Sequence, residues 1–173
     1  GSLGVYWGSG SPYDRDSARR GYFFAMKDSA PLSCTNFAVS PVSNCGTNGL
    51  YALRPGEGLT AEPVAYAGVV YFPTWTPASD RCSGGTGRLY GLRFDDCSPG
   101  LDTDGDGDAD SSDSAAISTG SAYPSGITVT DAGTILYGTS AVATDGSSSA
   151  VGTVSSATNP FLGTHSIAWM EVF

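Results

Sequence analysis

The sequence has few of the residues that typify helical, nucleic-acid-binding or metal-dependent catalytic proteins. It contains two Met, one His and eight Lys or Arg among 173 residues. Phosphate binding needs a basic stripe, and none is visible, so we expect no nucleic-acid partner. No run of about 18 apolar residues occurs, so we expect no membrane span. The single histidine, His165, has no nameable triad partner, and we interpret it as structural.

The residues that are abundant in the sequence favour β-structure. The chain has 24 Gly, ten Pro and nine Tyr, a composition that favours short strands joined by turns. A domain of about 150 residues buries roughly 70% of its unfolded surface, so we expect one all-β domain over residues 1–173. Gly1-Ser2 is typical of a cloning remnant, and we expect a longer natural polypeptide.

The four cysteines lack the CxxC spacing of a zinc site. They fall as two local pairs, Cys34 with Cys45 and Cys82 with Cys97, which suits disulfides in an oxidising, extracellular compartment. We favour these two pairings, and the other two connectivities stay open.

Two families of strand-like segments recur along the chain. The first family is VYWGSGSP at residues 5–12, VYFPTWTP at 70–77 and ILYGTSA at 135–141, which begin 65 residues apart. The second family is GYFFAMKD at 21–28, GLYAL at 49–53 and GRLYGLRF at 87–94. We expect members of the two families to pair as hairpins.

Repeats of four strands are typical of β-propeller blades, so we predict a portion of a modified β-propeller with two to three blades. A sandwich with similar strands is the alternative. Closed propellers need about four blades, so the open sheet edges need a partner. We favour the remainder of a parent protein over another chain that adds a strand.

Three stretches are predicted to be loops or insertions: residues 29–48, 98–125 and 143–158. The last includes a Val-Gly-Thr-Val segment that could form a short strand. The only predicted helix is a single turn at residues 114–118.

The insertion at 98–125 contains a pattern of alternate aspartates that is typical of an EF-hand calcium loop. The predicted ligands are Asp102, Asp104, Asp106, Asp108, Asp110 and Asp113. Without these six, eleven acids remain against eight basic residues, so most of the net charge of −9 lies in this loop. Gly107 stands at position 6, where the template needs a sharp turn.

On this template the first three aspartates give side-chain oxygens to Ca²⁺ and Asp108 gives its backbone carbonyl. Asp110 binds directly or through water, and Asp113 replaces the usual Glu at position 12. No apolar helix precedes the loop, so we interpret the site as local rather than as a sensor. A solvated acidic linker is the alternative.

Several segments resemble the C-terminal domain of PilY-type proteins, which are minor components and adhesins at type IV pilus tips. The matching text is VYWGSGSPYDRD, GYFFAMKD, AEPVAYAGVVYFPTWTPASDRCSGGTGRLYGLRFDD and SIAWMEVF. The resemblance implies a modified propeller at the pilus tip on the cell surface, with roles in pilus biogenesis and attachment and with minor pilus subunits as partners. It carries over Asp102, Asp104, Asp106 and Asp110 as calcium ligands, together with Asp113. The chain lacks the Arg-Gly-Asp motif, so integrin-type adhesion has no support, and the surface ligand is unknown.

Two other functions were weighed. A structural filament subunit would have its open edges completed by neighbouring copies. A quinoprotein-type propeller enzyme would bind calcium through residues dispersed over blades, unlike this local loop, and we expect no enzyme. Tyr13, Trp75 and Tyr123 could form an exposed ligand patch, although we expect Trp75 and Trp169 to be core residues.

Overall fold

The structure is a computed structural model that describes residues 3–14, 16, 18–28, 39–80, 83–130, 133–140 and 151–155. Within these ranges all regular secondary structure is β-strand, which confirms the all-β prediction. The strands are β1 (Leu3–Gly8), β2 (Arg20–Asp28), β3 (Val39–Pro41), β4 (Leu50–Pro55), β5 (Gly58–Leu59), β6 (Val64–Tyr66), β7 (Val69–Thr76), β8 (Thr86–Arg93), β9 (Ala116–Gly120), β10 (Pro124–Val129), β11 (Thr134–Thr139) and β12 (Val151–Ser155).

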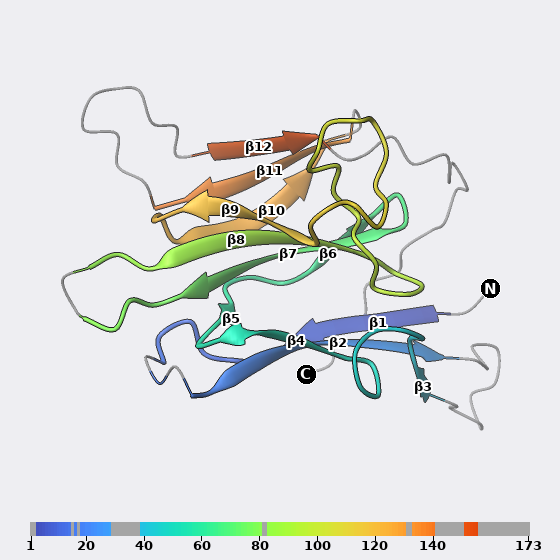
Figure 1. Ribbon diagram of the computed structural model, residues 1–173, viewed down its shortest axis with the longest axis horizontal. Helices are drawn as coiled ribbons and strands as arrows, with labels where there is room; N and C mark the ends of the chain where they lie inside the picture. The colour runs from blue at the N-terminus through green and yellow to red at the C-terminus, as the bar shows by residue number, and fades with distance from the viewer. Residues whose placement is uncertain are drawn as a thin grey trace.

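The strands form three antiparallel sheets. Sheet A consists of β1, β2, β3 and β4, sheet B of β5 to β9, and sheet C of β10, β11 and β12. The sheets lie one above another, with sheet A at the bottom of the view, sheet B in the middle and sheet C at the top (Figure 1). None of them closes on itself among the described strands.

The predicted hairpins are present in sheets A and B. Strand β1 pairs with β2 from Leu3↔Asp28 to Gly8↔Phe23, and β7 pairs with β8 along its whole length. The third segment of the first family is β11, which pairs with both β10 and β12. Strand β4, the remaining predicted segment, pairs with β2.

Sheet B is covered on both faces because side chains alternate along β7. Val70 and Phe72 face sheet A, where Phe72 stacks on Phe23 at 4.4 Å between ring centroids. Val69 and Tyr71 face sheet C and pack in a second core. Burial on both faces explains why β7 is a near-continuous apolar run rather than an alternation of apolar and polar residues.

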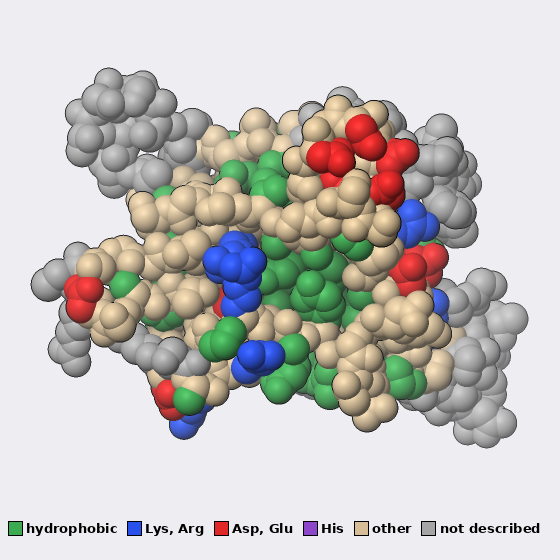
Figure 2. All heavy atoms as spheres, in the orientation of Figure 1, with side chains coloured by type: hydrophobic (Ala, Val, Ile, Leu, Met, Phe, Trp, Pro, Cys, Tyr) green, Lys and Arg blue, Asp and Glu red, His purple; other side chains and the backbone are tan. Residues whose placement is uncertain are grey.

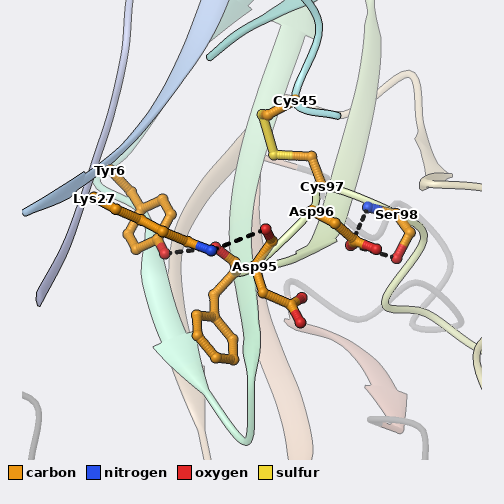
Figure 3. The surroundings of a disulfide bond; sticks show 8 residues. Tyr6, Lys27, Cys45, Asp95, Asp96, Cys97 and Ser98 are labelled. Atoms are coloured by element: carbon orange, nitrogen blue, oxygen red, sulfur yellow. Dashed lines mark hydrogen bonds between the residues drawn. A yellow bond between two sulfur atoms is a disulfide. The ribbon is translucent and has the colours of Figure 1, made fainter. Parts of the chain in front are cut away.

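The disulfide pairing predicted from sequence is wrong. Cys45, after β3, is bonded to Cys97, after β8, across a sequence separation of 52 residues (Figure 3). Both cysteines belong to the core between sheets A and B, so the stacking of the sheets, rather than proximity in sequence, brings them together. Cys34 and Cys82 lie outside the described residues.

The turn that carries Cys97 is also tied to sheet A by hydrogen bonds. The Tyr6 hydroxyl donates to the Phe94 carbonyl at 2.8 Å, and the Lys27 ammonium donates to the Asp95 carbonyl at 3.1 Å (Figure 3). This turn leads into the acidic loop, whose base is thereby attached to two sheets.

Two further predictions need correction. Residues 114–118 do not form a helical turn, because β9 pairs with β8 and lets Ile117 pack against the second core. The predicted loops 29–48 and 98–125 contain β3 and β9, and 98–125 also holds the start of β10. The Val-Gly-Thr-Val strand is confirmed as part of β12.

Candidate metal site

The acidic loop, residues 102–113, projects between β8 and β9, and its two ends are held on β8. The Gly100 amide donates to the Gly91 carbonyl at 2.9 Å, and the Gly91 amide donates to the Ala115 carbonyl at 3.0 Å. The Leu101 side chain is fully buried in the second core. Acidic side chains gather over this loop at the upper right of the space-filling view (Figure 2).

Three of the six predicted ligands lie together. One carboxylate oxygen from each of Asp102, Asp104 and Asp106 lies within 4.8 Å of the others, so this triad could hold a metal ion. Asp102 is half-buried, whereas Asp104 and Asp106 are exposed. The predicted ligands Asp108, Asp110 and Asp113 are not part of this triad.

The Asp102 carboxylate organises the turn of the loop. Its Oδ1 accepts the Gly105 amide at 2.6 Å, and its Oδ2 accepts the Gly107 amide at 3.0 Å. Gly107 has a backbone φ of +103°, a conformation that residues other than glycine rarely adopt. The glycine at template position 6 therefore makes the turn that the sequence pattern requires.

Asp113 closes the loop by binding its backbone. Its Oδ1 accepts the amides of Thr103 at 2.6 Å and Asp104 at 3.3 Å, and its Oδ2 accepts the Asp110 amide at 2.8 Å. These hydrogen bonds hold the pKa of the Asp113 carboxyl below its ordinary value, and the bond from the Thr103 amide contributes most. Asp113 is only 8% exposed. Sequence reasoning identified Asp113 but missed Thr103, because threonine carries no signal on the EF-hand template.

The remaining two aspartates differ in their surroundings. Asp108 is exposed, and repulsion, chiefly from Asp106, raises the pKa of its carboxyl. Asp110 is joined to the triad through Ser112, whose hydroxyl oxygen lies 2.7 Å from Asp110 Oδ1 and 3.0 Å from Asp104 Oδ2. Among the described residues, the ion pairs of Arg19, Arg88 and Arg93 involve acids outside the loop. None of these four ion pairs neutralises an aspartate of the loop.

A second carboxylate, Glu57, is buried at the junction of sheets A and B. Its side chain has no exposed surface, and its Oε1 lies 3.6 Å from Nη1 of Arg88. Thr74 donates a hydroxyl hydrogen bond to Oε1 at 2.5 Å, Tyr90 donates to Oε2 at 3.0 Å, and the Arg54 amide donates to Oε2 at 2.9 Å. The sequence gives little sign of this network beyond the spacing of Arg88 and Tyr90 at alternate positions of one strand.

No helix in the described part of the chain is long and apolar enough to cross a membrane. The buried disulfide fits an extracellular protein. Comparisons with protein-family models, with curated proteins and with solved structures give no match.

Proposed function

We propose that this chain is a calcium-binding, extracellular component of the type IV pilus machinery that acts by binding rather than by catalysis. The observation that carries the proposal is the Asp102, Asp104 and Asp106 triad. Ca²⁺ takes six to eight oxygen ligands in a flexible shell, and a curled loop of alternate aspartates offers such oxygens. Mg²⁺ demands near-ideal octahedral geometry and keeps several waters, which suits a six-aspartate loop less well.

The other predicted ligands would complete the shell in different ways. The Asp108 carbonyl and the Asp110 carboxylate stand at template positions 7 and 9. Asp113, at position 12, already holds the two ends of the loop together through its hydrogen bonds. Its contribution is therefore to fix the loop in a conformation that keeps the first three carboxylates close.

The pilus assignment is supported by the sequence resemblance and by where its segments lie. VYWGSGSPYDRD and GYFFAMKD correspond to the hairpin of β1 and β2, and the long third segment includes β7 and β8. These segments are the frameworks of sheets A and B, and the Cys45–Cys97 disulfide is consistent with the cell surface. Minor pilus subunits are the partners that this proposal predicts.

The outer face of sheet A supports completion by further β-structure. Val5 and Trp7 are each 42% exposed and Tyr22 is 37% exposed, although all three are apolar or aromatic. Trp7 stacks on Phe24 at 4.8 Å, and Phe24 and Met26 are only partly buried. Aromatic side chains on both faces of β2 resemble the two-sided burial of β7, which favours a further sheet of the same longer protein as the occupant.

A structural filament subunit is the second candidate, because the same apolar face could receive a neighbouring copy. In that case calcium would promote polymers, whereas the adhesin proposal predicts none. Light scattering on the samples of the titration below separates the two functions.

The test is a calcium titration by calorimetry on metal-free protein, with the melting temperature read at each point. We expect a dissociation constant of about 10⁻⁴ to 10⁻³ M and a melting temperature that rises with free calcium. The double variant Asp104→Ala, Asp106→Ala should lose both effects. The matched control is Glu62→Ala, Asp80→Ala, which removes two exposed acids outside the loop.

The control variant should bind calcium like the intact chain. If the intact chain shows neither heat nor a shift in melting temperature, the loop is an acidic linker and the calcium proposal is wrong. If the Asp104→Ala, Asp106→Ala variant binds calcium as tightly as the intact chain, the calcium site does not involve the triad.

A further inference from the structure

Three aromatic side chains from distant parts of the sequence meet at one site. Tyr13 lies in the turn between β1 and β2, Trp75 is on β7, and Tyr123 directly precedes β10. The ring centroids of Tyr13 and Tyr123 are 6.3 Å apart with planes 10° from parallel. Those of Trp75 and Tyr123 are 5.5 Å apart and tilted by 58°. We call these three residues the aromatic cluster.

The inner part of the aromatic cluster is held firmly by backbone contacts. Tyr123 donates its amide hydrogen to the Ser140 hydroxyl at 2.8 Å, and the Ser140 amide donates to the Tyr123 carbonyl at 2.8 Å. Gly85 lies so close to the Trp75 ring that a Cβ atom there would overlap it. Burial and a hydrogen bond with the Tyr13 side chain raise the pKa of Tyr123 to about 12, so its hydroxyl stays protonated at neutral pH.

The outer part of the cluster faces solvent. The Tyr13 side chain is 79% exposed, more than any other exposed large hydrophobic residue in the described part of the chain. Its own turn is fixed, because the Ser11 hydroxyl accepts the Tyr13 amide at 3.3 Å and the Ser11 carbonyl accepts the Asp14 amide at 3.2 Å. An exposed tyrosine ring on an ordered turn, next to two further rings, offers an aromatic face to a ligand.

A polar hollow borders the same turn. It has a volume of about 290 Å³ and is lined by Ser11 and Asp14, which flank Tyr13, and by Asp16, Arg19, Arg20 and the buried Glu57, with glycines as its other wall residues. Arg19 pairs with Asp14 at 3.2 Å and with Asp16 at 3.6 Å. The carboxylates of Asp14 and Asp16 balance the guanidinium groups of Arg19 and Arg20, and Glu57 is paired with Arg88, so the hollow favours neither a strong anion nor a strong cation.

We propose that the aromatic cluster and the adjoining hollow form a binding site for a neutral saccharide. A sugar ring has an apolar face of C–H groups, which suits an exposed tyrosine ring, and a rim of hydroxyls that both donate and accept hydrogen bonds. Carboxylates accept such bonds and guanidinium groups donate them. Binding sites commonly combine aromatic walls with a few placed polar groups in this way.

Other ligand classes fit these residues less well. A proline-rich peptide is recognised by a groove lined with aromatic rings and gains nothing from four charged groups beside it. A phosphate or other strong anion would meet Asp14 and Asp16 on a chain whose net charge is −9. A neutral polyhydroxylated ring uses both the stacked rings and the balanced charges.

The inference deepens the proposed binding function, because it names the class of surface ligand and rests on the chain being an adhesive component. It does not depend on the metal, because the site lies on the β1–β2 turn, the end of β7 and the residue before β10, not on the acidic loop. The two proposals therefore fail separately when saccharide binding and calcium binding are measured on the same protein.

The experiment is a titration of the intact chain by calorimetry and saturation-transfer NMR. The probes are three neutral hexasaccharides, cellohexaose, maltohexaose and chitohexaose, together with hexagalacturonic acid and a proline decapeptide. Each is measured once with calcium chloride and once with chelator. We expect at least one neutral hexasaccharide to bind under both conditions, with saturation transferred to its ring C–H protons.

The variants locate the site. Tyr13→Ala should weaken saccharide binding about tenfold, as the loss of one stacked ring predicts, and Tyr13→Phe should keep most of it. The matched control is Phe94→Ala, which removes an exposed aromatic ring directly after β8, at the opposite end of the β7–β8 pair from Trp75, and should change nothing. Because Tyr13 is 79% exposed, its replacement leaves the fold intact. The proposal is overturned if no neutral saccharide binds, if only the acidic or proline probe binds, or if Tyr13→Ala binds like the intact chain.

Discussion

The two carboxylate sites of this protein differ in how their charge is compensated. Glu57 is buried and has Arg88, Thr74, Tyr90 and the Arg54 amide around its two oxygens. The Asp102, Asp104 and Asp106 triad is largely exposed, and the ion pairs of Arg19, Arg88 and Arg93 involve acids outside the loop. The first site has its counter-charge and hydrogen-bond donors within the chain, whereas the second gathers carboxylate oxygens that could hold a metal ion.

This difference separates a carboxylate that stabilises the fold from carboxylates that could hold a metal ion. A buried charge must be paired and hydrogen-bonded, or its desolvation is not repaid. Like charges on a surface loop stay together only because other bonds force them to, and here those bonds are donated by backbone amides to Asp102 and Asp113. The three predictions that follow test this contrast, from the largest expected effect to the smallest.

The largest effect is expected for Glu57→Ala. The substitution leaves Arg88, Tyr90 and Thr74 without their acceptor in a buried place, and the free energy of unfolding should fall by about 3–5 kcal/mol. Chemical denaturation measures the loss. Calcium affinity should not change in the fraction that is folded, and Glu62→Ala, which removes an exposed glutamate, should shift stability by less than about 0.5 kcal/mol. A neutral result for Glu57→Ala would show that the network contributes little.

An intermediate effect is expected for Asp113→Asn. The new amide group would face the Asp110 amide, so a hydrogen bond to Oδ2 is lost and the loop closes less well. We expect calcium affinity to fall about tenfold, as for residues that orient metal ligands, with a melting temperature lower by several degrees without metal.

Because the pKa of Asp113 is lowered, the stability it contributes is present above its ordinary pKa and lost only as pH falls through the lowered value. The deficit of the variant should therefore persist to about pH 4.

The smallest effect, with the opposite pH dependence, is expected for Asp108→Asn. This change removes a repelling charge, so the metal-free melting temperature should rise slightly, and calcium affinity should change by less than about threefold because only the backbone carbonyl is a ligand. The raised pKa of Asp108 means that acid relieves the repulsion in the intact chain as pH falls through that value. The difference between variant and intact chain should shrink between pH 7 and about pH 4. A large loss of affinity would instead make the Asp108 side chain a ligand.

Much of the framework could be predicted because it depends on local patterns. Glycine followed by an aromatic-rich run marks β2, β4 and β8, and the hairpins of sheets A and B follow from the pairing of neighbouring segments. The acidic loop could be predicted for the same reason, since its aspartates are spaced within twelve residues. Gly107 adopts the positive φ that its template position requires.

What could not be predicted depends on contacts between distant segments. Cys45 and Cys97 meet because two sheets stack, and nothing in their spacing reveals this. Residues 114–118 look like a single helical turn when taken alone, but the pairing of β9 with β8 and the packing of Ile117 against the second core favour a strand. The burial of Glu57 requires partners from β7 and β8, which lie 17 and 33 residues away along the chain.

The Cys45–Cys97 bond also makes a closed covalent ring out of one third of the chain. A pull on the two ends of the chain is transmitted through the disulfide directly from residue 45 to residue 97, so β4 to β8 bear no tension once the flanking strands have detached. The ring withholds roughly 170 Å of extensible chain, given about 3.3 Å per residue over 52 residues. A protease that nicks the ring leaves its two pieces joined. The ring therefore keeps β4 to β8 linked, whereas β9 and the acidic loop lie outside it.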